Sequence, residues 1–158
     1  MQRQEIPIQS LQIIIAAFGL GVVAFLAVAL GIGPVSPPAE GQEGITLYIL
    51  IVGGAVVTSA VPAVLFMRRR SEASLAPRRA EALEEVRAGR VPPELASSTI
   101  MGAAVGEGIG LLGVVAYLLE GRGLALFLVG LGLAAVASHF PTLERLKERV
   151  ERLGRASY

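Results

Sequence analysis

Glu107 is the residue most able to carry chemistry in this chain, because it is the single charged side chain within the apolar stretch Leu95–Leu119. A carboxylate in the middle of a membrane helix is costly, so such a residue indicates a functional site. The bilayer penalises the anion, and we expect the neutral, protonated form. Two roles fit this residue: a proton-binding carboxyl for translocation, or a structural acid that hydrogen-bonds to a neighbouring helix or subunit.

Three side chains are candidate hydrogen-bond partners of Glu107. Thr58 and Ser59 carry hydroxyls in the preceding apolar stretch, and His139 is the only histidine. If the last two apolar stretches are centred alike, His139 lies about 10 Å from Glu107 in depth, from roughly seven residues at 1.5 Å each. His139 could then pass protons between the membrane and water. The alternative is a histidine that lies at the membrane interface.

The composition excludes most familiar catalytic and metal-binding arrangements. The 158 residues contain no Cys, Asp or Asn, and one His. Disulfides, thiolate catalysis, Ser-His-Asp triads and clusters of Cys or His ligands are therefore ruled out. We predict a protein that is not an enzyme and that uses no metal or cofactor. Nucleic-acid binding is not expected either, because membrane topology accounts for the basic residues.

A stripe of small residues marks the helix that would carry Glu107. Gly102, Gly106 and Gly110 form two overlapping GxxxG steps. This spacing lets a second helix approach closely. The second helix could be the first apolar stretch, where Ala17 and Gly21 offer a matching small-xxx-small step, or a helix of another subunit. Of these two, packing against a helix of the same chain is the simpler alternative.

Four apolar stretches must position these residues. They span about residues 11–33, 45–67, 95–119 and 124–141, and form a predicted transmembrane domain over residues 1–141. About 20 apolar residues cross the roughly 30 Å of hydrocarbon, and a segment in lipid must satisfy its own backbone groups. With 53% hydrophobic residues and a mean hydropathy of +0.64, we predict an all-α membrane protein, a four-helix bundle of two transmembrane hairpins.

The basic residues predict the orientation. All fourteen except Arg122 fall before the first stretch, in the loop 68–94, or after the last stretch. The positive-inside rule places these three parts in the cytoplasm. We expect a multi-pass protein of the bacterial inner (cytoplasmic) membrane with both termini inside.

Two cytoplasmic segments carry helical patterns. Pro77 could open a short helix through Arg87, with a solvated loop as the alternative. Residues 142–158 form a predicted cytoplasmic amphipathic helix, because apolar side chains recur there at three- and four-residue spacing. These side chains are Leu143, Leu146, Val150 and Leu153. The helix could lie at the lipid headgroups, dock on a partner, or extend the last span into solvent.

The two halves of the chain resemble each other, as in a duplicated helical hairpin. Residues 16–21 align with residues 103–108, and residues 59–62 align with residues 138–141. If the halves arose by duplication, Glu107 stands where the first half has Leu20.

Two family resemblances follow from these motifs. On Gly106-Glu107-Gly108, residues 115–121 and Phe140-Pro141-Thr142, the chain resembles a group of uncharacterised small four-helix bacterial membrane proteins. More distantly, its duplicated hairpin, glycine-rich helices and lone glutamate are similar to the rotor-ring proteolipids (c/K-type subunits) of vacuolar-type ATPases. That resemblance implies a proton-carrying Glu107 and a ring of copies. The chain departs from the proteolipids in carrying its acid on the first helix of a hairpin rather than the second.

We therefore expect an integral membrane protein that serves as a small structural or accessory subunit of a larger membrane complex. Its partners would be membrane lipids and other membrane subunits, or further copies of itself. The alternative is a proton-translocating, proteolipid-like subunit that uses Glu107.

Overall fold

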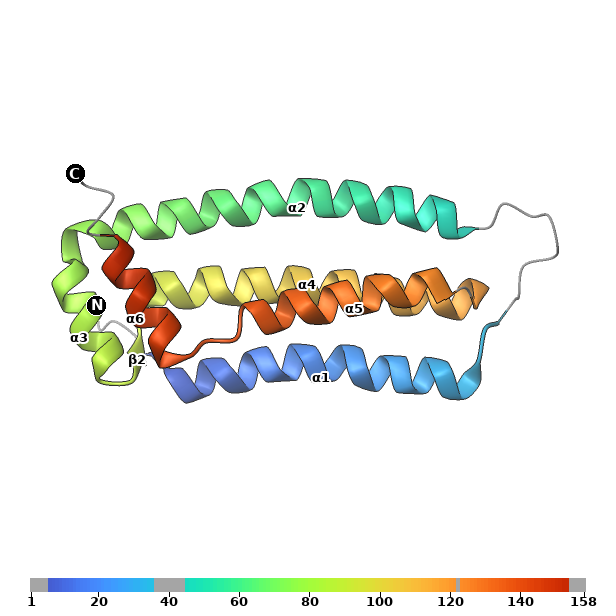
Figure 1. Ribbon diagram of the computed structural model, residues 1–158, viewed down its shortest axis with the longest axis horizontal. Helices are drawn as coiled ribbons and strands as arrows, with labels where there is room; N and C mark the ends of the chain where they lie inside the picture. The colour runs from blue at the N-terminus through green and yellow to red at the C-terminus, as the bar shows by residue number, and fades with distance from the viewer. Residues whose placement is uncertain (1–5, 36–44, 122, 154–158) are drawn as a thin grey trace.

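The computed structural model describes residues 6–35, 45–121 and 123–153, with only part of the side chains between residues 45 and 61. The elements in chain order are β1 (Ile6–Pro7), α1 (Ile8–Ile32), α2 (Ile45–Leu75), the 3₁₀ turn η1 (Ala76–Arg78), α3 (Arg79–Arg87), β2 (Arg90–Val91), α4 (Pro93–Glu120), α5 (Gly123–Ser138) and α6 (Leu143–Arg152). The long helices run side by side, with α4 and α5 between α1 and α2 (Figure 1). The short elements gather at one end of this bundle.

Length and composition give two candidate membrane spans, α1 and α4, among the described residues. A third is counted if α5 and α6, which are bent by 72° at the break between them, make one broken span. Alone, the 16 residues of α5 reach about 24 Å, less than the roughly 30 Å of hydrocarbon. The all-α class is thus confirmed, with two or three candidate spans. The span predicted in α2 stays a prediction.

The central helix, α4, has clear sequence signals at both ends. Pro93 opens it, at the position where a missing N–H costs nothing because that group has no partner within the helix. Gly121 ends it in the left-handed conformation, with φ 66°, which glycine adopts without a steric penalty. Inside the first turns, the buried hydroxyl of Thr99 donates to the carbonyl oxygen of Leu95 at 2.7 Å. This bond satisfies the buried hydroxyl of Thr99.

The boundaries of two predicted segments need correction. The loop predicted at 68–94 is largely helical, because α2 continues to Leu75 and is followed by η1 and α3. The last apolar helix ends at Ser138 rather than 141. Pro141 lies in the connection to α6, where its ring cannot continue a helix.

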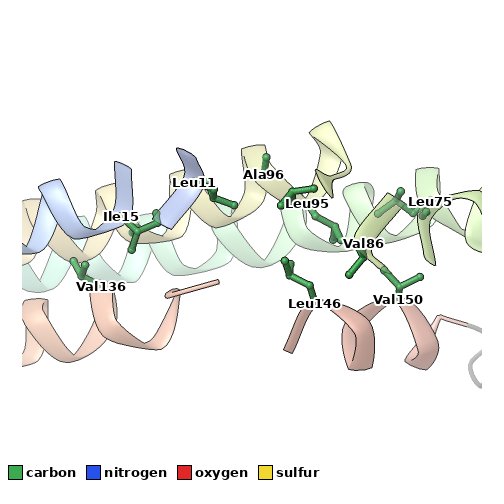
Figure 2. Packing of buried hydrophobic residues seen from close by; sticks show 12 residues of the cluster. Leu11, Ile15, Leu75, Val86, Leu95, Ala96, Val136, Leu146 and Val150 are labelled. Atoms are coloured by element: carbon green, nitrogen blue, oxygen red, sulfur yellow. The ribbon is translucent and has the colours of Figure 1, made fainter. Parts of the chain in front are cut away.

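A hydrophobic core lies between the first turns of α4 and the short elements, in a region that we call the basic cap: the last turns of α2 (68–75), η1, α3, β2 and α6. Its buried side chains come from distant parts of the sequence, and include Leu75, Val86, Leu95, Leu146 and Val150 (Figure 2). Each of these five side chains is at most 4% exposed. The cap is therefore a packed layer at the end of the bundle.

The short helix predicted from Pro77 to Arg87 is confirmed by η1 and α3, and the solvated-loop alternative is wrong. Arg78 ties this helix to α4, because its guanidinium pairs with Glu85 of α3 at 2.7 Å and with Glu94 of α4 at 3.3 Å. No pattern in the sequence indicated the antiparallel pair β1–β2, in which Ile6 faces Val91. This two-residue pairing ties the start of α1 to the cap.

The amphipathic helix predicted after residue 141 is confirmed as α6. The hydroxyl of Thr142 accepts from the backbone N–H of Arg145 at 3.3 Å, a standard N-terminal cap. Of the three placements considered, a solvated extension of the last span is wrong, because α6 is bent away by 72°. Its apolar face instead covers the chain's own cap core, beside α3.

The two hairpins pack differently. α4 and α5 lie directly against each other, whereas α1 and α2 stand on opposite sides of that pair (Figure 1). A duplication of the sequence, if it occurred, has not kept the same packing in both halves.

Docking of α6 by its apolar face predicts unequal effects of two leucine truncations. Leu146 is 4% exposed and Leu143 is 38% exposed on the same helix. Leu146→Ala should lower the free energy of unfolding by about 2–4 kcal/mol, because it leaves a cavity in the cap core. The matched change Leu143→Ala should cost less than about 1 kcal/mol. Thermal unfolding in mild detergent measures both, and equal losses would contradict the docking.

Candidate functional site

Glycines let α4 and α5 meet backbone to backbone. A methyl group built on Gly106 would lie 2.8 Å from the backbone nitrogen of Val136. One built on Gly113 would lie 2.7 Å from the backbone nitrogen of Val129. On the facing helix, a methyl group on Gly132 would strike the backbone of Gly110. Only glycine fits at these points, and we call this contact the glycine seam (Gly106, Gly113 and Gly132).

The residues predicted for helix packing occupy different surroundings. Gly106 faces α5, and Gly102 faces His139, which directly follows α5. Gly110 lies between Gly132 of α5 and Val22 of α1, and a methyl group built on Gly110 would be 2.9 Å from Cγ1 of Val22. Ala17 is exposed, so the step from Ala17 to Gly21 does not form the surface that meets the stripe. Gly132 was not among the predicted packing residues, although the pair of glycines at 130 and 132 was a signal for it.

Glu107 lies on another side of α4, half-buried and turned toward α1. Its Oε1 would be 3.2 Å from a methyl group built on Gly21. Gly21 thus leaves room for the carboxyl beside the backbone of α1. The structure brings together two of the predicted residues, Glu107 and Gly21, which the sequence had assigned to separate roles.

Two of the proposed partners of Glu107 bond elsewhere. The hydroxyl of Thr58 donates to the carbonyl oxygen of Gly54 at 2.6 Å, within α2. The Nδ1 atom of His139 lies 2.8 Å from the carbonyl oxygen of Ala135. The side chain of Ser59 lies outside the described residues. The described hydroxyl and imidazole therefore do not form a relay with Glu107.

His139 packs over Gly102, and a side chain at Gly102 would occupy the position of the imidazole ring. Because a carbonyl oxygen only accepts, a hydrogen bond to Ala135 requires the hydrogen on Nδ1, which leaves Nε2 as an acceptor in the neutral ring. Residues 102 and 107 are about 140° apart around α4, at 3.6 residues per turn. This angle places His139 and Glu107 on different sides of α4.

Comparison with known protein families, with curated proteins and with solved structures found no match for this chain. The two family resemblances therefore remain expectations from the sequence. Among the residues that the structure describes, no three His, Asp or Glu side chains come together as metal ligands. Three structural observations bear on function: the position of Glu107, the close packing at the glycine seam, and the exposed apolar surface.

The glycine seam makes a matched test possible on one helix. Gly106→Ala should lower the free energy of unfolding by about 1–3 kcal/mol, because the new methyl group must push two backbones apart. Gly108→Ala, with no atom within 4 Å of its methyl position, should be neutral or stabilising by up to about 1 kcal/mol. Unfolding in mild detergent, followed by circular dichroism, measures both changes. Equal stability of the two variants would contradict close packing at Gly106.

Proposed function

We propose that this chain is a four-span integral membrane protein that acts as a small, non-enzymatic accessory subunit of a larger membrane complex. The observation that carries this proposal is the apolar surface of the long helices. Large hydrophobic side chains are exposed along α1, α2 and α5, and include Ile13, Leu20, Val28, Leu65, Phe66, Leu124 and Phe127. Surfaces of this kind mark contact with lipid or with other proteins.

The distribution of charge supports insertion with both termini in the cytoplasm. The basic cap, at one end of the bundle, holds three of the described charged segments: the last turns of α2, the helix α3 and the helix α6 (Figure 1). The turn between α4 and α5 lies at the opposite end. The positive-inside rule assigns the cap to the cytoplasmic face of an inner membrane.

The position of Glu107 favours a structural role. Its carboxyl lies against Gly21 of the same chain, and the described candidates for a relay bond to their own helices. A carboxyl at this place can fix how α1 and α4 pack, as polar contacts do between membrane helices. The alternative is a proton-translocating, proteolipid-like subunit. One observation favours this alternative: the side chain of Glu107 is only half-buried, and a carboxyl that carries protons must be accessible to the groups that exchange them.

The two functions differ in their response to Glu107→Gln. Glutamine keeps the shape and hydrogen-bonding capacity of a neutral glutamate but cannot exchange a proton. For an accessory subunit, the variant should co-purify with the same membrane subunits as the wild type and support the same cellular function. Purification in mild detergent, with identification of the bound subunits, makes this comparison.

Two outcomes would contradict the accessory role. One is a chain that purifies without other subunits, as a closed ring of many copies. The other is a folded Glu107→Gln variant that has lost proton transport, together with a wild-type protein modified at Glu107 by a hydrophobic carbodiimide.

Orientation can be tested with single cysteines, because the chain has none of its own. Gly123 and Ala88 are both exposed. Gly123 begins α5, whose start lies at the end of the bundle opposite the basic cap, and Ala88 directly follows α3 in the cap (Figure 1). In intact cells, a membrane-impermeant thiol reagent should label Gly123→Cys and leave Ala88→Cys unlabelled until the cells are opened. Labelling of Ala88→Cys in intact cells would reverse the proposed orientation.

A further inference from the structure

A cavity of about 650 Å³ opens where the basic cap meets the bundle. It lies between α2, α4, α5 and α6, and its volume is within the range of small-molecule sites. Along α4 it runs from Ser98 to Ile109, which is about 16 Å at 1.5 Å per residue. Its long axis therefore follows the direction of the helices.

The two ends of the cavity differ in chemistry. The end within the bundle has apolar walls, with Val64 and Leu65 of α2 facing Val105 and Ile109 of α4. The end at the basic cap is lined by arginines: Arg68 of α2, and Arg145, Arg149 and Arg152 of α6. An occupant that satisfies both ends has an anionic head and an apolar tail.

Arg149 is the most buried of these four arginines. Its side chain is 19% exposed, and its guanidinium pairs with Glu72 at 3.3 Å and donates to the Ser98 hydroxyl at 3.4 Å. Glu72 is shared, because it also pairs with Arg68 at 3.0 Å. Burial lowers the pKa of Arg149, and the nearby charge of Arg68 lowers it further, while Glu72 opposes both effects. The site thus holds two neighbouring cations on one carboxylate.

The charges at the mouth of the cavity leave an excess of cation. Arg152 is 71% exposed and pairs with Glu148 at 3.1 Å, so two carboxylates, Glu72 and Glu148, face four arginines. An anion placed here would offset repulsion between the guanidinium groups. Arginine is suited to phosphate, which it can bind through two parallel hydrogen bonds.

We propose that this cavity binds an anionic phospholipid, with the phosphate at the arginines of α2 and α6 and one acyl chain between α2 and α4. Basic pockets between membrane helices on the cytoplasmic side recognise lipid headgroups in this way. Free phosphate would bind to the arginines, but it would leave the apolar walls of the cavity in contact with water, which is unfavourable. The inference rests on the proposed membrane insertion and is independent of the accessory role.

The first test compares lipid binding to the full-length chain in mild detergent by native mass spectrometry. Phosphatidylglycerol should bind as one tightly held molecule, at least about tenfold tighter than phosphatidylcholine, since the excess cations favour the net anion. Inorganic phosphate at millimolar concentration should not displace it. Equal binding of the two lipids would refute the proposal, and displacement by phosphate would reassign the site to a soluble anion.

Variants separate the headgroup contacts from general charge. Arg152→Gln changes an exposed side chain and should fold normally, and combined with Arg149→Gln it should weaken phosphatidylglycerol binding by about tenfold or more. The matched control combines Arg87→Gln with Arg90→Gln, which also removes two positive charges, because both arginines are exposed in the basic cap. An equal loss in the control would show that net charge, rather than the cavity, holds the lipid.

The apolar end is tested by filling it. Val105→Trp places a large ring in the cavity and should weaken binding of phosphatidylglycerol by about tenfold or more. Ile13→Trp, at a position 70% exposed on α1, should bind as the wild type does. Unchanged binding by a folded Val105→Trp variant would exclude the acyl chain from this place. Because the assay uses detergent and added lipid, its failure leaves the accessory role standing, and failure to find partner subunits leaves the lipid site standing.

Discussion

The close contact between the backbones of α4 and α5 fixes how these two helices pack, and the other long helices pack around this pair. At Gly106, Gly113 and Gly132 there is no room for even a methyl group, so the two helices lie closer than side chains would allow. In lipid, where apolar side chains gain little from leaving their surroundings, such close packing is a main source of helix association. The pair α4–α5 then offers two sides, on which α1 and α2 pack separately.

The basic cap at the end of the bundle is held together by a different interaction. Its elements are charged, and without a shared apolar core they would stay solvated instead of packing together. The apolar face of α6, with Leu146 and Val150 buried against Leu75 and Val86, gives them a shared core. The same docking of α6 brings Arg149 to Glu72 of α2 and lines one end of the cavity with arginines. Docking of one helix thus sets both the packing and the local charge of this end.

Glu107 shows how rotation about one helix decides the surroundings of a residue. Glu107 lies five positions after Gly102, and this places the two on different sides of α4. Gly102 packs against the ring of His139, which directly follows α5, while Glu107 lies beside Gly21 of α1. A carboxyl beside a helix backbone, away from the imidazole, suits a packing contact better than a proton relay.

Local signals were enough to predict the helical class, the approximate extent of α1 and α4, the short helix α3 and the amphipathic helix α6. These signals are apolar length, Pro77 at the start of the short helix, and the spacing of Leu146 and Val150. Residue type alone singled out Glu107 and the glycine stripe. Only the tertiary structure shows that the glycine stripe packs against α5, that Gly21 lies beside Glu107, and that Arg149 pairs with Glu72. Those pairings depend on the rotation and crossing of helices, which periodicity within one helix does not encode, because several helices offer equally apolar faces.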